Sequence, residues 1–195
     1  MRIGRREALK GLLLCGVAGF LSGHAPYRQW QVYRAERLMI VACRREPEAF
    51  PLAQTLAADL ARSIPQAKPE AARAPTMLHV TRLVLTRQIE VALLTVPQAQ
   101  DMFQGKGEGA SEGPVPLKLL ALLRPPFVLV CHQDFDRDRA YLVAFGAFDN
   151  GGSQALGTQS AGLAPLLRRS AEMGIPLHPG AQEFYVEQGA AKPQG

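Results

Sequence analysis

The stretch from Arg37 to Thr95 constrains the fold more than any other, because it has the pattern of two consecutive strand–helix steps. Residues 38–43, Leu-Met-Ile-Val-Ala-Cys, form a continuous apolar run, which is typical of a strand covered on both faces. Between Pro51 and Pro65, Leu recurs at every fourth position, as on the apolar face of a helix. We therefore expect a buried strand followed by an amphipathic helix.

The next segment repeats this order. A short stretch over 70–74 leads to an expected helix from Thr76 to Arg87, and the apolar run over 89–94 predicts a second strand, which Pro97 ends. Right-handed crossovers place such strands in one sheet with helices on its faces. Ligands in that architecture lie beyond the carboxyl ends of the strands. The residues thus predict a binding architecture, but they reveal no reaction.

Two further apolar runs, over 117–123 and 127–131, predict two more strands, and Arg124-Pro-Pro126 separates them. A short break with two prolines indicates a strand that bends or changes register rather than an ordinary hairpin. The segment from Tyr141 to Phe148 is apolar enough to be buried, either as a helix or as a strand.

Composition divides the chain into five parts. Residues 1–25 and 26–36 precede an α/β lobe over 37–150, and a linker over 151–159 leads to a C-terminal helix and closing segment over 160–195. The expected fold class is essentially one lobe with a mostly parallel sheet flanked by helices. We expect the C-terminal helical segment to pack back on this lobe.

The net charge of +5 would by itself suggest an acidic partner. The distribution of the charged residues along the chain weakens that interpretation. Residues 1–25 contain four basic side chains and one acidic one, whereas the rest has 18 basic and 16 acidic side chains. The basicity therefore belongs mostly to the N-terminus, and nucleic-acid binding loses its main support.

The N-terminus has the order of a targeting segment. Arg5-Arg6-Glu-Ala-Leu-Lys10 precedes an apolar run over 11–21 and a small-residue end, Gly23-His-Ala25. The paired arginines resemble a twin-arginine (Tat) export signal, which implies a periplasmic protein. Because Pro26 follows directly, either the signal is removed or it stays attached as a membrane tether, with residues 26–36 at the membrane interface or packed on the lobe. A plain N-terminal helix buried in the domain is the alternative.

Export would place Cys43 and Cys131 in an oxidising compartment. Each ends an expected strand, so they either form a disulfide or remain two separate buried thiols. We favour the thiols, because free cysteine commonly behaves as a small core residue.

Chemical motifs predict no cofactor and no metal site. Asp134-Phe-Asp136-Arg-Asp138 has the opening spacing of a calcium loop, but Arg139 stands where the glycine is required. Gly105-Lys-Gly-Glu-Gly109 lacks the Lys-Ser/Thr ending of a P-loop and is expected to be a flexible loop. No nucleophile–base pair or carboxylate pair stands out, so we expect no catalytic residues and a protein that is not an enzyme.

The end of the chain carries a more specific pattern. Ile175-Pro-Leu-His-Pro-Gly-Ala181, followed by Glu183-Phe-Tyr185, resembles the closing motif of the TAXI family of TRAP-transporter solute-binding proteins. Residues 88–94 resemble a strand in the first lobe of that family. The resemblance implies a periplasmic binding protein-like fold of type 2 and a role in solute transport with TRAP membrane subunits.

The sequence departs from the family pattern in two places. TAXI receptors resemble one another in a Gly-Ser turn that receives the ligand carboxylate, whereas this chain has Ala74-Pro-Thr76, in which proline removes a donor. Most of the second lobe is also missing, because only a short linker separates Asn150 from the closing helix. A solute would lie against one open wall and lose most of the burial that is typical of small-molecule sites.

Two functions follow from these observations. The first is an exported, TAXI-like protein that binds a small anionic solute. Its carboxylate would lie at the carboxyl ends of the strands, near Thr76 at the expected N-terminus of the second helix. Three arginines, which are otherwise solvated loop residues, could bind it there: Arg44, Arg45 and Arg73. The second is a reduced, non-catalytic binding module that holds a protein partner, in the periplasm or at the membrane, through its sheet edge or its closing helix.

Overall fold

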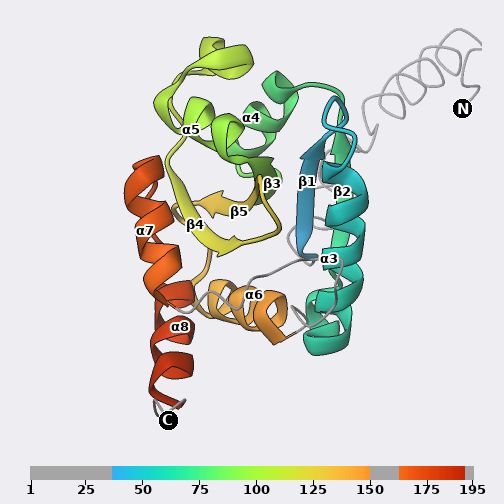
Figure 1. Cartoon of the computed structure of the whole chain (residues 1–195). Helices are drawn as coiled ribbons and strands as arrows, with labels where there is room; N and C mark the ends of the chain where they lie inside the picture. Colours follow the sequence, from blue (N-terminus) through green and yellow to red (C-terminus); the bar gives the residue numbers. More distant parts are fainter. Residues whose placement is uncertain (1–36, 150–162, 192–195) are drawn as a thin grey trace, which may run out of the picture. The chain divides into compact units, whose positions relative to one another are not determined.

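The computed structural model describes residues 37–149 and 163–191, which form a five-stranded sheet flanked by helices (Figure 1). The strands are β1 Met39–Cys43, β2 Glu70–Ala74, β3 Val91–Thr95, β4 Leu117–Leu122 and β5 Phe127–His132. The α-helices are α3 Ala49–Ser63, α4 Met77–Leu85, α5 Val96–Gln104, α6 Arg137–Asp149, α7 Leu163–Met173 and α8 Pro179–Ala191. Two short 3-10 helices are η1 Pro65–Ala67 and η2 Gly107–Glu112. Across the sheet the strand order is β2–β1–β3–β5–β4.

Strand β1 lies between β2 and β3 and is parallel to both. The apolar runs that predict β1 and β3 are therefore confirmed as neighbouring parallel strands. Residues 70–74, in contrast, form strand β2 and not a mere connecting stretch. Their sequence, Glu-Ala-Ala-Arg-Ala, has no β-branched or aromatic residue, so pairing with β1 and not intrinsic propensity makes this segment extended.

The sheet is mixed, and the prediction of a mostly parallel sheet is wrong for its second half. Strand β5 is antiparallel to β3, and β4 is antiparallel to β5. β4 and β5 form a hairpin, in which the Phe127 N–H donates to the Arg124 carbonyl at 2.9 Å. Both prolines lie inside this four-residue turn, where the sheet needs no N–H from them, so they do not prevent the hairpin. A register shift does occur, but within β4, between Leu119 and Ala121.

The helices cover both faces of the sheet. Helix α3 connects β1 to β2 and α4 connects β2 to β3, and these crossovers run in opposite directions across the sheet. Right-handed connections therefore place α3 and α4 on opposite faces. Helix α6 packs beside α3, where Gly146 lies against Leu60, and α5 and η2 pack with α4. The apolar segment over 141–148 is thus part of a helix, and the expected loop over 105–116 contains η2.

The C-terminal segment packs on the lobe, as the sequence predicts. The Leu119 N–H donates to the Pro176 carbonyl and the His178 N–H to the Leu119 carbonyl, both at 2.9 Å, so this segment covers the outer edge of β4. Phe184 of α8 is fully buried, and its ring makes edge contacts with Tyr141 and Phe148 of α6. The closing motif is therefore part of the core.

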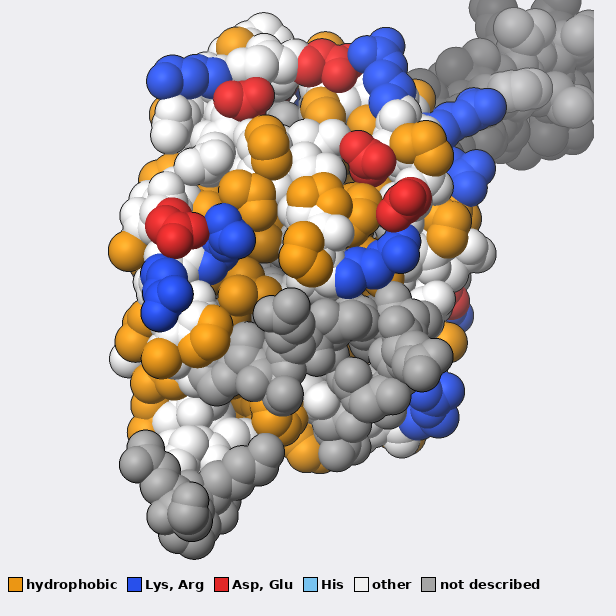
Figure 2. Space-filling view, in the orientation of Figure 1, with side chains coloured by type: hydrophobic (Ala, Val, Ile, Leu, Met, Phe, Trp, Pro, Cys, Tyr) orange, Lys and Arg blue, Asp and Glu red, His pale blue; other side chains and the backbone are white. Residues whose placement is uncertain are grey.

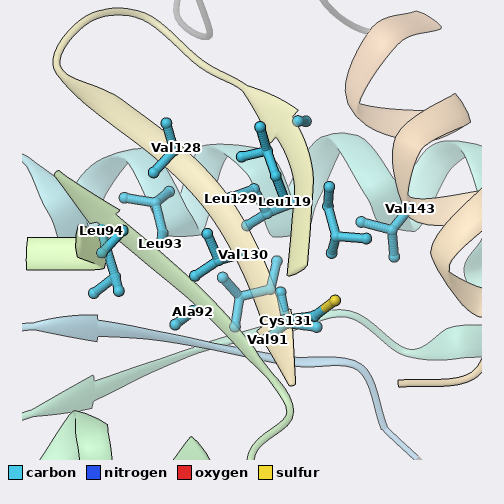
Figure 3. Packing of buried hydrophobic residues seen from close by; sticks show 14 of the residues in the cluster. Val91, Ala92, Leu93, Leu94, Leu119, Val128, Leu129, Val130, Cys131 and Val143 are labelled. Carbon is cyan, nitrogen blue, oxygen red and sulfur yellow. The ribbon is translucent and has the colours of Figure 1, made fainter. Parts of the chain in front are cut away.

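Strands β3 and β5 form the centre of that core, because every residue of both is buried. Figure 3 shows Leu93 of β3 near Leu129 of β5, with Leu119 of β4 and Val143 of α6 beyond them. Each large side chain buried in this way contributes about 1.5–3 kcal/mol to folding.

Cys43 and Cys131 are both buried free thiols, which confirms the favoured prediction. Cys43 pairs with Ala74 on β2, whereas Cys131 pairs with Val91 on β3, so the two cysteines belong to strands that β3 separates. Burial in this apolar setting raises the pKa of the Cys131 thiol well above its usual value.

Three of the expected parts, 1–25, 26–36 and 151–159, lie outside the described residues. Within 37–149 and 163–191, none of the helices combines the length and the apolar character needed to cross a bilayer.

Candidate functional site

Two of the four predicted site residues follow β1 directly. The Arg44 backbone N–H donates to the Ala74 carbonyl at 2.7 Å, which continues the β1–β2 pairing, and its side chain is exposed. The Arg45 side chain forms a 2.9 Å ion pair with Glu108 of η2. The structure therefore turns Arg45 toward the face of the sheet that carries α4 and η2.

The other two residues belong to the β2–α4 connection. The Arg73 guanidinium lies over the ring of Phe50, 4.0 Å from its centroid, and Phe50 is part of α3. Thr76 is the N-cap of α4, where its hydroxyl oxygen accepts the His79 backbone N–H at 3.3 Å and lies 2.7 Å from His79 Nδ1. Thr76 thus caps a helix, as its position predicts.

These four side chains share one edge of the sheet, but their charged groups do not converge. Arg73 contacts α3 on one face, whereas Arg45 pairs with η2 on the other face. The Arg44 side chain remains exposed. A shared carboxylate would require at least one arginine to leave its present partner, so carboxylate binding by this set stays a prediction.

A pocket of about 280 Å³ lies at the same edge of the sheet, where β3 ends and β5 begins. The β4–β5 turn, the start of α5 and helix α7 surround it. Its apolar wall is formed by side chains from all of these elements: Val96, Leu122, Leu123, Pro125, Pro126, Phe127, Val128 and Pro165. We call this cavity the turn pocket.

The wall of the turn pocket has few hydrogen-bond donors. Three of its residues are prolines, which lack a backbone N–H. The Val96 N–H is already donated to the Pro126 carbonyl at 2.9 Å. The start of α5 is closed by a capping box between Thr95 and Gln98, so the first turn of that helix uses its own donors. A ligand would find apolar contacts here and no donor at the α5 terminus.

All charged residues that line the turn pocket belong to α7. Arg168, Arg169 and Glu172 line it, and Arg169 forms a 2.9 Å ion pair with Glu172. Arg168 has no ion pair or hydrogen bond with any other residue in the described part of the chain. Figure 2 shows basic and acidic side chains beside hydrophobic ones on the surface where α7 lies in Figure 1. The pocket therefore combines an apolar wall with one uncompensated guanidinium.

Sequence reasoning missed this pocket although it noted its parts. The Pro125-Pro126 break and the α7 pattern are visible in the sequence, but they are far apart in the chain. Two contacts bring α7 to the turn: the closing segment returns to β4 through Leu119 and Leu177, and the Gln100 side chain of α5 donates to the Glu172 carbonyl at 3.4 Å. No local pattern reports either contact.

The buried histidines have structural roles. His178 Nδ1 accepts the Gly180 N–H at 3.2 Å and Nε2 donates to the Phe135 carbonyl at 2.9 Å, so both nitrogens of a neutral ring are used. His132 Nδ1 accepts the Asp134 N–H at 3.2 Å. Burial is the main cause that lowers the pKa of both rings. Among the described residues, no group of three His, Cys, Asp or Glu side chains is placed to hold a metal ion.

Comparisons with known proteins identify no family for this chain. No protein-family model matches it, and no curated protein is significantly similar to it. The likeness to TAXI proteins therefore rests on the closing motif and on the strand over 88–94.

Proposed function

We propose that this chain is a non-catalytic binding protein for a small organic anion and that the turn pocket is its binding site. The observation that carries the proposal is the unpaired Arg168 guanidinium beside a wall of apolar side chains. An anion with an apolar body would satisfy both features at once, because its charge meets the arginine while its body leaves water.

The wider setting of this function is also a proposal. The closing motif over 175–185 supports a type 2 periplasmic binding protein-like lobe that serves a TRAP-type transport system. The Arg5-Arg6 segment supports export by a Tat-type signal to the periplasm, where residues 1–34 would act as a tether if they stay attached.

Binding should be weak. Burial of four or five methylene groups at about 0.8 kcal/mol each contributes roughly 4 kcal/mol, which corresponds to a Kd of about 1 mM. Arg168 is exposed, so its ion pair with the ligand adds at most about 1 kcal/mol. These two contributions set a lower limit of roughly 0.2 mM on the Kd, because the loss of translational and rotational freedom on binding opposes them.

Titration calorimetry with hexanoate, succinate and glutamate tests the proposal. At least one of these anions should bind the wild type, and Arg168→Gln should weaken that binding about fivefold, because it removes an ion pair worth about 1 kcal/mol. Arg44→Gln is the matched control, since Arg44 is also an exposed arginine but lies outside the turn pocket. No heat with any anion at millimolar concentration, or an equal loss in both variants, would overturn the assignment.

One observation favours the second function, a module that holds a protein partner. Strand β2 is the outermost strand on its side of the sheet, whereas the outer edge of β4 is covered by the closing segment. The closing helix offers little apolar docking surface, because Phe184 and Tyr185 are buried and Val186 is the one large hydrophobic side chain that its described residues expose. A partner strand added to β2 is thus the remaining form of this function. Residues 70 and 74 of β2 form backbone hydrogen bonds with β1, so the alternate Ala71 N–H faces the free edge, and pull-down with Ala71→Pro against wild type would test strand addition.

A further inference from the structure

We infer that the ligand of the turn pocket is an apolar monocarboxylate of about six carbons, such as a short-chain fatty acid. This inference rests on the proposed function and narrows it to a chemical class. Three properties of the pocket carry it: its net charge, its lack of hydrogen-bond partners and its size.

The charge of the pocket fits one negative group. Arg169 and Glu172 neutralise each other in their 2.9 Å ion pair, which leaves the single positive charge of Arg168. A second carboxylate on the ligand would meet Glu172 or the apolar wall, and neither stabilises an anion. A monoanion is therefore favoured over a dicarboxylate.

The wall also disfavours polar groups on the body of the ligand. Pro125, Pro126 and Pro165 offer no backbone N–H, and the Val96 N–H is bound to the Pro126 carbonyl. The same bond occupies the Pro126 carbonyl, so a hydroxyl group placed there would lose water without gaining an equivalent partner. Hydroxy acids should therefore bind less tightly than the plain acid of the same length.

The size of the pocket limits the length of the chain. A water molecule takes up about 30 Å³ in the liquid, and a methylene group is of similar size. The 280 Å³ of the turn pocket thus has room for about nine heavy atoms. Hexanoate is close to that size, whereas much longer acids must leave part of their chain in water.

Calorimetry with butanoate, hexanoate, adipate and 6-hydroxyhexanoate tests this class directly. Hexanoate should bind roughly fifteenfold more tightly than butanoate, because each added methylene contributes about fourfold. Adipate and 6-hydroxyhexanoate, which have chains of the same length with a polar far end, should bind about tenfold more weakly than hexanoate. Leu122→Phe, which fills the pocket from β4, should remove the dependence on chain length without changing the melting temperature greatly.

The outcomes separate this inference from the proposed function. If adipate or 6-hydroxyhexanoate binds as tightly as hexanoate and Arg168→Gln weakens that binding, the pocket remains the site but the inferred ligand class is wrong. If hexanoate binds with the same affinity in wild type, Arg168→Gln and Leu122→Phe, or if neither these four acids nor succinate and glutamate bind, both the inference and the proposed function are overturned.

Discussion

The Arg73 guanidinium lies 4.0 Å from the centroid of the Phe50 ring, so an arginine at the carboxyl end of β2 is held by α3. This contact explains why the arginines that were predicted to bind one carboxylate do not converge. Arg73 is drawn to one face of the sheet while Arg45 pairs with Glu108 on the other. The contact also gives Arg73 a structural role, which can be measured.

Replacement of Arg73 by Ala should lower the free energy of unfolding by about 0.5–1 kcal/mol, because an exposed cation–π contact is worth that much. Arg44→Ala should leave the free energy of unfolding unchanged, since its exposed side chain has no such contact. Urea denaturation measures both. A variant Arg73→Ala with wild-type stability and no anion binding would instead favour the site predicted from the sequence.

Close packing of α8 on α6 predicts opposite effects for two glycines of the same helix. A Cβ at Gly180 would lie 2.1 Å from the Arg137 carbonyl oxygen, whereas a Cβ at Gly189 would meet nothing within 4 Å. Gly180→Ala should therefore cost about 1–3 kcal/mol of stability through overpacking. Gly189→Ala should be neutral or stabilise the helix by up to about 1 kcal/mol. Equal melting temperatures for the two variants would contradict the packing of α8.

The buried His178 predicts a loss of stability in mild acid. Burial lowers the pKa of its ring in the folded protein from the ordinary value of 6.5, so the unfolded chain binds more protons. The contribution of the neutral ring is complete above pH 6.5 and is lost as the pH falls from there through the lower folded pKa. His132 shifts in the same direction and adds to the effect.

Urea denaturation between pH 8 and pH 5 measures this dependence. The free energy of unfolding should fall toward pH 5 in the wild type and fall less steeply in His178→Gln, which has no titrating ring. A wild-type stability that rises toward pH 5 would show that the neutral ring, held by Gly180 and Phe135, is not the favoured form.

The proposed export has its own test. If the Tat machinery reads Arg5 and Arg6, replacement of both by Lys should leave the full-length protein in the cytoplasm. Cell fractionation measures the result, and Lys10→Arg is the matched control, because it keeps both the charge of the segment and the arginine pair. Periplasmic recovery of the double variant at the wild-type level would exclude this signal.

Much of the fold could be predicted from local patterns. The apolar runs of β1, β3 and β5 specify buried strands, and the spacing of leucines specifies α3. The direction of β5 could not be predicted, because an apolar run has the same period in a parallel and an antiparallel strand. Strand β2 was missed for a related reason, since its extended form depends on pairing with β1.

The candidate site was harder to predict than the fold. Sequence reasoning placed Arg44, Arg45, Arg73 and Thr76 at the correct edge, but it could not assign the partners of their side chains. Glu108 and Phe50, which hold two of them, come from η2 and α3. The position of Arg168 depends on contacts between segments that are distant in the chain.

Amide chemical-shift mapping with hexanoate tests the central claim most directly, because it locates the bound anion on the folded protein. In a nitrogen–proton correlation spectrum, titration of hexanoate should shift the amides of Val96, Phe127 and Val128, which line the turn pocket. The same titration of Arg168→Gln should require about fivefold more ligand for equal shifts. Shifts confined to Arg44, Arg73 and Thr76, with the turn-pocket amides unmoved, would contradict the account and place the anion at the cluster predicted from the sequence.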